Sequence, residues 1–383
     1  MKFANITVKN NLFLAPMAGI CDVAFRVLCK KYGAGFVYSE FINVEGILRE
    51  IPNSMKMLKT VEEEKPVGIQ IFGTNLDSIG KSCRILQDKA DLIDLNLGCP
   101  VHKVTCTGAG AALLEKPEKL GEIVRTMVAN SSIPITVKMR RVESYEKTIK
   151  IAKIIQDSGA SALTLHGRTV PQGYTGRADW SYICAVKEAL DIPVFGNGDI
   201  RSREDYLQIL KETNCDAVLV GRAAMTNPGI FREILDGTLP DKFEMFFEYA
   251  KLAEKFEVIT ANSASHSVQK LKVMAQHFTK GIEGAARIRE AMNTVHSVEG
   301  IMEIMEKARD GLFVIGNNIK NNGIIINEIQ KQESITIDNS GGYITTCPEL
   351  SNKTIQKKSH TNHRIVYNKT EQAAEKEIVC SYA

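Results

Sequence analysis

The sequence contains 383 residues, of which 44% are hydrophobic and 24% are charged. These proportions are typical of a globular protein, and they exclude a largely disordered chain or a fibrous repeat. The formal net charge of +3 is too small to indicate nucleic-acid binding unless basic residues cluster locally.

No apolar run approaches the roughly 20 residues that span a bilayer. The first ten residues, MKFANITVKN, also lack the apolar core of a signal peptide. We therefore expect a cytoplasmic protein without a membrane partner. The nine cysteines are odd in number and form no CxxC pair, so we expect reduced thiols and no metal site.

Eight short apolar runs recur over the first 221 residues. They are LFLAP (12–16), GFVYSE (35–40), PVGIQIF (66–72), LIDLNL (92–97), IPITVKM (133–139), ALTLHG (162–167), IPVFGN (192–197) and DAVLVG (216–221). Their continuous apolarity predicts strands that are buried on both faces. Helical signals lie between them, such as Asp22 and Ser202 as N-caps and Pro117 as a first helical residue.

Alternation of eight strands with helices predicts an α/β fold, a TIM-type (β/α)8 barrel over residues 1–238. An open, doubly wound sheet is the alternative, but no GxGxxG follows the first run, which disfavours its dinucleotide-binding form. Catalytic residues of a barrel lie at the carboxyl ends of its strands. We therefore expect the polar residues that follow the eight runs to meet at one rim.

The last two of these loops read GNGDI and GRAAMTNPGIF. Glycines allow the backbone to approach an anion and Arg222 can neutralise it, so the loops predict a phosphate site, although tight turns would also need glycine. Lys138 and Gln70 at the same rim would suit a cofactor that develops negative charge, such as FMN. A lone lysine at a strand end is otherwise usually a solvated side chain.

Cys99 follows the fourth run in NLGCPVHKVTCTGAGAA, residues 96–112. A cysteine in this place can pack, bind a metal, act in redox chemistry or donate a proton, and Cys106 in the same loop competes for any such role. Lys138 and His166 share the rim and could tune the thiol. His166 can equally be a hydrogen-bonded core residue.

From DKFEMFFEYAKLAEKFEVIT to about Leu312, apolar residues recur at helical spacing, which predicts a small all-α helical domain over residues 239–312. Its basic residues include Lys270, Lys272 and Arg287, which would contact phosphates or simply form a solvated face. Residues 313–383 are rich in Asn, Gly, Ser and Lys, and we expect a mobile, poorly structured tail. SITIDNSGGYITT within it could form a hairpin around Ser340 and Gly341.

Seven blocks in this order resemble the tRNA-dihydrouridine synthase family. They are APMAGICDVAFR, QIFG, DLNLGCPVHKVTCTGAGAALL, ITVKMR, LTLHGRTVPQGYTGRADW, IPVFGNGDI and DAVLVGRAAMTNPGIF, and they span about residues 12–235. The resemblance implies an FMN-binding barrel and a helical domain that binds tRNA. It also implies reduction of the C5–C6 double bond of uridine to 5,6-dihydrouridine, with NADPH or NADH recharging the flavin.

The resemblance assigns roles to individual residues. Pro16, Met17 and Ala18 would line the flavin ring, Gln70 and Lys138 would bind its polar edge, His166 would lie beside it, and Asn197, Gly198, Asp199, Gly221 and Arg222 would hold the phosphate. Asn96, Arg140 and Arg168 at the rim, with Lys270, Lys272 and Arg287, are candidates for contacting the substrate. No obligate protein partner is implied.

In this scheme Cys99 donates the proton to C5 after hydride from FMNH2 has reached C6, and Asn96 donates a hydrogen bond to the enolate oxygen. An ordinary thiol is mostly protonated at neutral pH and can serve as such an acid. Two alternatives stay open. One is an FMN-dependent enzyme for a small pyrimidine-like molecule, similar to dihydroorotate dehydrogenase. The other is a non-catalytic tRNA-binding protein on the same scaffold.

Overall fold

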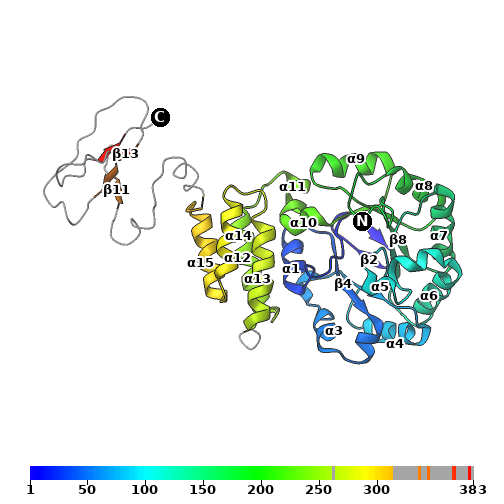
Figure 1. Cartoon of the computed structure of the whole chain (residues 1–383). Helices are drawn as coiled ribbons and strands as arrows, with labels where there is room; N and C mark the ends of the chain where they lie inside the picture. Colours follow the sequence, from blue (N-terminus) through cyan, green and yellow to red (C-terminus); the bar gives the residue numbers. More distant parts are fainter. Residues whose placement is uncertain (261–263, 314–334, 338–342, 346–364, 368–377, 381–383) are drawn as a thin grey trace. The chain divides into compact units, whose positions relative to one another are not determined.

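The computed structural model describes residues 1–260 and 264–313, together with four short strands near the carboxyl terminus (Figure 1). The chain divides into two compact units, Met1–Val314 and Ile315–Ala383. The first contains a barrel and four further helices. Residues 313–383 are predicted to be mobile, and almost all of them lie outside the described residues.

Eight parallel strands close into a barrel in the order β10-β3-β4-β5-β6-β7-β8-β9. This closed strand order confirms the predicted barrel, and the alternative prediction of an open, doubly wound sheet is wrong. Each strand coincides with one of the eight apolar runs, and its continuous burial follows from helices outside and packed side chains inside. The strands are β3 (Leu12–Leu14), β4 (Phe36–Asn43), β5 (Val67–Phe72), β6 (Leu92–Leu97), β7 (Ile135–Arg140), β8 (Ala162–His166), β9 (Val194–Asn197) and β10 (Ala217–Val220).

Helices surround the strands, and three of these helices begin at the residues that the sequence predicts. Asp22 accepts a hydrogen bond from Phe25 N at the start of α1, Ser202 does the same for Asp205 N at α9, and Pro117 is the first residue of α6. The long barrel helices are α1 (Val23–Lys31), α4 (Leu76–Leu86), α6 (Pro117–Ala129), α7 (Tyr145–Asp157), α8 (Ser181–Ala189) and α9 (Arg203–Thr213).

Shorter helical segments fill the connections of the barrel. They are α2 (Val44–Leu48), α3 (Pro52–Met57), η1 (Glu62–Glu64), α5 (His102–Thr105), η2 (Gly110–Glu115), α10 (Arg222–Thr226) and α11 (Ile230–Asp236). Two of them, α5 and η2, lie in the loop that carries Cys99. The sequence did not predict these short segments, because none is long enough to show a helical period.

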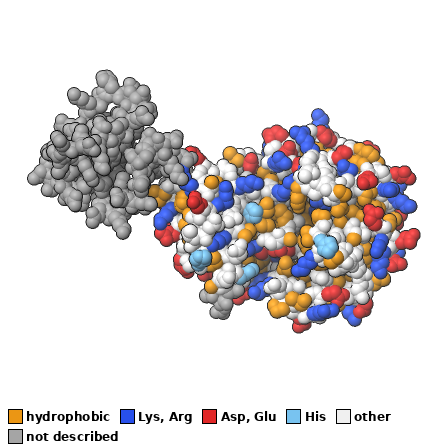
Figure 2. All heavy atoms as spheres, viewed as in Figure 1, with side chains coloured by type: hydrophobic (Ala, Val, Ile, Leu, Met, Phe, Trp, Pro, Cys, Tyr) orange, Lys and Arg blue, Asp and Glu red, His pale blue; other side chains and the backbone are white. Residues whose placement is uncertain are grey.

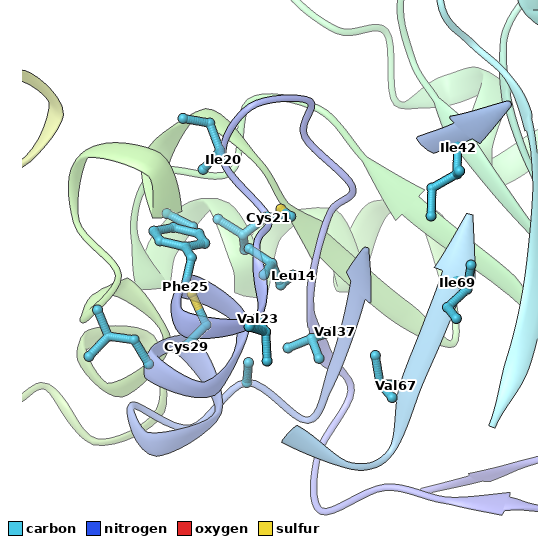
Figure 3. Close-up of a cluster of buried hydrophobic side chains, with 14 of the residues drawn as sticks. Leu14, Ile20, Cys21, Val23, Phe25, Cys29, Val37, Ile42, Val67 and Ile69 are labelled. Carbon is cyan, nitrogen blue, oxygen red and sulfur yellow. The ribbon is translucent and has the colours of Figure 1, made fainter. Parts of the chain in front are cut away.

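One layer of the core lies between helix α1 and the strands. Figure 3 shows Phe25 and Cys29 of α1 beside Leu14 of β3 and Val37 of β4. All four side chains are fully buried. This packing fixes the start of α1, and with it the loop that follows β3.

A hairpin closes the amino-terminal end of the barrel. Its strands β1 (Lys2–Phe3) and β2 (Ile6–Thr7) pair antiparallel. The ring of Phe3 lies 5.2 Å from that of Phe195 and 6.0 Å from those of Phe13 and Phe36, measured between centroids. The aromatic cluster therefore fills the interior of the barrel at this end.

Among the described residues, four helices follow the barrel, which agrees with the predicted helical segment after it. They are α12 (Lys242–Lys255), α13 (Ala264–Phe278), α14 (Ala285–Thr294) and α15 (Val298–Arg309). Helix α12 packs against α1, and α13 packs against α10. The buried aromatic side chains Phe246, Tyr249 and Phe278 join α12 to α13. The four helices and the barrel therefore share one core.

The carboxyl-terminal unit contains two antiparallel pairs, β11 (Ile335–Ile337) with β12 (Tyr343–Thr345), and β13 (Ile365–Tyr367) with β14 (Ile378–Cys380). The first pair confirms the predicted hairpin strands, whereas the predicted turn at Ser340 and Gly341 lies outside the described residues. Within the part of the chain that is described, no helix is long and apolar enough to cross a membrane.

The hairpin that closes the barrel leads to a test of stability. Replacing Phe3 with Ala removes a side chain that is 2% exposed, and we expect a loss of about 3–5 kcal/mol in the free energy of unfolding. Guanidinium denaturation measures this loss. The control is Lys2→Ala, because Lys2 is exposed in the same strand. Equal stabilities of the two variants would show that the aromatic cluster does not support the barrel.

Candidate functional site

The residues predicted from the barrel loops come together at its carboxyl-terminal end. Strand register places Asn96 beside Lys138, Arg140 beside His166, and His166 beside Asn197. Side chains of register partners in a parallel sheet lie on the same face. Pro16, Met17 and Ala18 follow β3, Gly198 and Asp199 follow β9, and Gly221 and Arg222 follow β10.

A chain of hydrogen bonds runs through the inside of this end. Asp94 accepts from Thr136 Oγ1 at 2.6 Å and from Gln70 Nε2 at 2.6 Å. Gln70 Oε1 in turn accepts from Asn96 Nδ2 at 2.7 Å. Asn96 Oδ1 accepts from the backbone N–H groups of Gly98 at 3.1 Å and Cys99 at 3.0 Å.

Asp94 is fully buried. Burial raises the pKa of its carboxyl to about 6, although the hydrogen bonds from Gln70 and Thr136 and the charge of Lys138 lower it. Neither Asp94 nor Thr136 is among the site residues predicted from the sequence. The sequence did contain an indication for Asp94, because a carboxylate inside the apolar run LIDLNL needs a polar partner.

The two thiols of the loop after β6 have different surroundings. Cys99 is 7% exposed and packs with Phe72, Val104 and Ala109, and its carbonyl oxygen accepts from the N–H of Ala111 at 3.2 Å. Cys106 is exposed at the end of α5. The loop therefore holds Cys99 at a fixed place in the rim and leaves Cys106 in solvent.

Lys138 has no hydrogen bond or ion pair to any residue that the structure describes. Burial is the main cause that lowers the pKa of its ammonium, to about 8, and the charge of Arg140 lowers it further, while Asp94 opposes the shift. An unpaired ammonium in a partly dry site is stabilised by an anionic or electron-rich group. Lys138 is thus suited to bind such a group.

His166 is a neutral imidazole in this environment. Burial, followed by the charges of Lys138, Arg140, Arg168 and Arg222, holds its pKa far below the usual range. A neutral imidazole has one donor and one acceptor nitrogen, so His166 can orient a polar ligand without adding charge.

A charged cluster lies beside His166. Arg168 Nη2 donates to Asp199 Oδ2 at 2.7 Å, and Arg222 Nη2 donates to Asp199 Oδ1 at 3.1 Å. Arg168 is 1% exposed, and its Nη1 is buried without a hydrogen-bond partner in the described part of the chain. A buried guanidinium nitrogen without an acceptor is costly, and an oxygen of a bound anion would satisfy it.

The backbone beside this cluster fits a phosphate. Gly198 and Asp199 have φ angles of +126° and +60°, and a Cβ atom added to Gly198 would lie 3.0 Å from His166 Cδ2. Only glycine allows this approach. The carboxylate of Asp199 itself would repel a phosphate, but its charge orients Arg168 and Arg222. Any direct contact of Asp199 with a phosphate would come from its backbone N–H.

The basic residues of the helical segment have partners outside the cluster of Arg168, Asp199 and Arg222. Lys270 Nζ is 2.6 Å from Asp22 Oδ2 and donates to Gly19 O at 2.7 Å, and its side chain is 11% exposed. Arg287 donates to Phe313 O at 2.7 Å, and Lys272 is half-buried. Lys270 therefore joins α13 to the loop after β3, a contact that helical periodicity does not reveal.

Figure 2 shows Lys and Arg side chains mixed with Asp and Glu over the visible surface of the barrel. The four cations that lower the pKa of His166, in contrast, gather around one rim residue. Roles for Lys270, Lys272 and Arg287 in contacting a substrate stay predictions.

Comparison with solved structures finds the same type of fold. The structure titled 2-naphthoyl-CoA reductase in complex with 2-naphthoyl-CoA superposes with a TM-score of 0.50 at 13% sequence identity. The match covers 63% of this chain and 52% of that chain. At this identity the likeness concerns the fold alone.

Comparison of sequences is more specific. The family model described as dihydrouridine synthase (Dus) matches residues 13–311. A probable tRNA-dihydrouridine synthase of Aquifex aeolicus is 31% identical over 313 residues, which are 79% of this chain and 97% of the relative. The tRNA-dihydrouridine synthase B of Pasteurella multocida is 35% identical over 306 residues, 77% of this chain and 91% of the relative. The chain belongs to the dihydrouridine synthase family.

Proposed function

We propose that the protein is an FMN-dependent enzyme that reduces the C5–C6 double bond of uridines in tRNA to 5,6-dihydrouridine, with NADPH or NADH as the reductant. The proposal is carried by two cationic groups at the same rim that lack a partner among the described residues, the buried Nη1 of Arg168 and the ammonium of Lys138. A ligand that has both an anionic oxygen and an electron-rich edge would stabilise these two groups together. FMN has both, and the family membership agrees with it.

Different residues at the rim would bind the phosphate and the ring of FMN. The phosphate would lie against Gly198, Gly221, Arg168 and Arg222, with Asn197 and the backbone of Asp199 closing the loop. Asn197 is held in place because its Nδ2 donates to Leu219 O at 2.9 Å. Pro16, Met17 and Ala18 would line the ring, and a Cβ atom added to Gly221 would lie 3.8 Å from Met17 Sδ.

Gln70, Lys138 and His166 would meet the polar edge of the ring. Gln70 keeps one amide hydrogen after its bond to Asp94, and the neutral His166 can donate or accept. The Lys138 ammonium would stabilise negative charge on that edge. When bound, FMN supplies the hydride that reaches C6 of the uracil ring.

Cys99 would donate the proton that completes the reaction at C5. Its backbone is fixed on both sides, by Asn96 and by Ala111, so the thiol can deliver a proton from one direction. Asn96 keeps one amide hydrogen after its bond to Gln70, and this hydrogen would stabilise the enolate oxygen at C4. Arg140 would orient the nucleotide at the mouth of the site.

Residues 239–312 would form the tRNA-binding helical domain, in which Lys272 and Arg287 are candidates for phosphate contacts. A flavin enzyme for a small pyrimidine-like substrate would act without RNA. A non-catalytic protein would bind tRNA without oxidising NADPH. Assays of NADPH oxidation with and without tRNA distinguish the three functions.

The function leads to a test in cells. In a strain that lacks the gene, tRNA should lose dihydrouridine at one or more positions, and the wild-type gene should restore it. We expect Cys99→Ala to retain FMN but to restore less than about a hundredth of the modification, because a positioned general acid contributes about 10²–10⁴-fold to rate. Mass spectrometry of digested tRNA measures the outcome.

Cys106→Ala is the matched control for that experiment, because this thiol is exposed in the same loop. It should restore dihydrouridine like the wild type. If Cys106→Ala abolishes the modification and Cys99→Ala does not, the proton donor has been assigned to the wrong residue.

The lowered pKa of Lys138 predicts that FMN binding depends on pH. The ammonium is charged below its pKa of about 8 and loses its charge above it, so affinity for the electron-rich edge of the flavin ring should fall severalfold between pH 7 and pH 9. Quenching of flavin fluorescence during titration of the FMN-free protein measures the dissociation constant. In Lys138→Met the affinity should be low at both values. A wild-type dissociation constant that is equal at both would refute this role.

A further inference from the structure

The strongest unexplained feature is the buried carboxylate of Asp94, for which the reaction has no direct use. It lies at the start of the hydrogen-bond chain that leads through Gln70 and Asn96 to the backbone of Cys99. Each link is 2.6 to 3.0 Å long. All three side chains are less than 9% exposed, so water cannot readily replace a lost link.

The chain has a direction, which the acceptor-only carboxylate of Asp94 specifies at one end and the donor-only N–H groups of Gly98 and Cys99 specify at the other. An ionised carboxylate can only accept hydrogen bonds, so Gln70 must turn its amide nitrogen toward Asp94. Its oxygen then faces Asn96, which must turn its own nitrogen toward Gln70. The oxygen of Asn96 is consequently left to accept from the N–H groups of Gly98 and Cys99.

We propose that Asp94 is a positioning residue that fixes the orientation of the Gln70 and Asn96 amides and, through them, the backbone of Cys99. Its importance for catalysis rests on the proposed function, because that function makes Cys99 the proton donor. The hydrogen-bond chain itself does not depend on that function.

Stability alone would not favour a carboxylate here. Asp94 has no ion pair to any described residue, and its burial disfavours the charged form. An asparagine has nearly the same shape and carries no charge to desolvate. What asparagine lacks is the acceptor-only character, because it offers one acceptor and one donor group.

The variant Asp94→Asn should therefore fold, but the chain is no longer held in one direction at this end, and a reversed arrangement becomes accessible. The amide that replaces the carboxylate can donate to Gln70, which lets the Gln70 amide turn around and present its nitrogen to Asn96. Asn96 then turns its own nitrogen toward Gly98 and Cys99, whose N–H groups lose their acceptor. The loop should open more often at Cys99.

Hydrogen exchange measures this opening directly. The experiment follows peptides that cover residues 96–106 of the full-length, FMN-free protein by mass spectrometry, without tRNA or NADPH. In Asp94→Asn the amides of Gly98 and Cys99 should exchange about tenfold faster, as expected for the loss of a buried hydrogen bond. The melting temperature should stay equal or rise.

A double variant provides the rescue. In Asp94→Asn with Asn96→Asp, the carboxylate at position 96 accepts from Gly98, Cys99 and Gln70, and Gln70 accepts from the amide at position 94. The chain is satisfied again in the opposite direction, so exchange should return to the wild-type rate. Thr136→Val is the control, because it removes one donor to Asp94 and leaves the direction unchanged; its exchange at Cys99 should match the wild type.

Unchanged exchange in Asp94→Asn, or no recovery in the double variant, would overturn the proposal. If Asp94→Asn does not fold, Gln70→Leu interrupts the same chain between Asp94 and Asn96, and unchanged exchange in that variant would overturn it equally. Failure of the proposed function would leave these exchange rates as expected, so the two outcomes are distinguishable.

Discussion

The open end of the barrel carries more positive than negative charge. Lys138, Arg140, Arg168 and Arg222 all depress the pKa of His166, while Asp199 is the carboxylate that pairs with two of them. Such a cluster is unfavourable unless an anion or electron-rich group completes it. Strand ends and short loops hold all of these side chains in place for such a group.

The rest of the fold supports this arrangement. The aromatic cluster around Phe3 fills the amino-terminal end, so the polar layer of Gln70, Asp94 and Asn96 lies on a packed base. The helical segment contributes from outside, because Lys270 holds Asp22 and the carbonyl of Gly19. One end of the barrel is thereby rigid, and the other presents ordered donors.

Much of this could be predicted from the sequence. Continuous apolar runs revealed all eight barrel strands, because strands buried on both faces have little choice of residue. Rim residues such as Lys138 and His166 followed from their place at strand ends. The network around Asp94 could not be found in this way, since its partners Gln70 and Thr136 lie 24 and 42 residues away along the chain. The contact of Lys270 with Gly19 spans 251 residues, and only tertiary structure brings the two together.

We propose that this rim, loaded with FMN, reduces uridine within tRNA. The most direct measurement incubates an unmodified tRNA transcript with the FMN-loaded protein and NADPH and determines the mass of each nucleotide. The account predicts that one or more uridines gain the mass of two hydrogen atoms. A transcript whose uridines all keep their original mass, although the protein binds both FMN and the transcript, would contradict it.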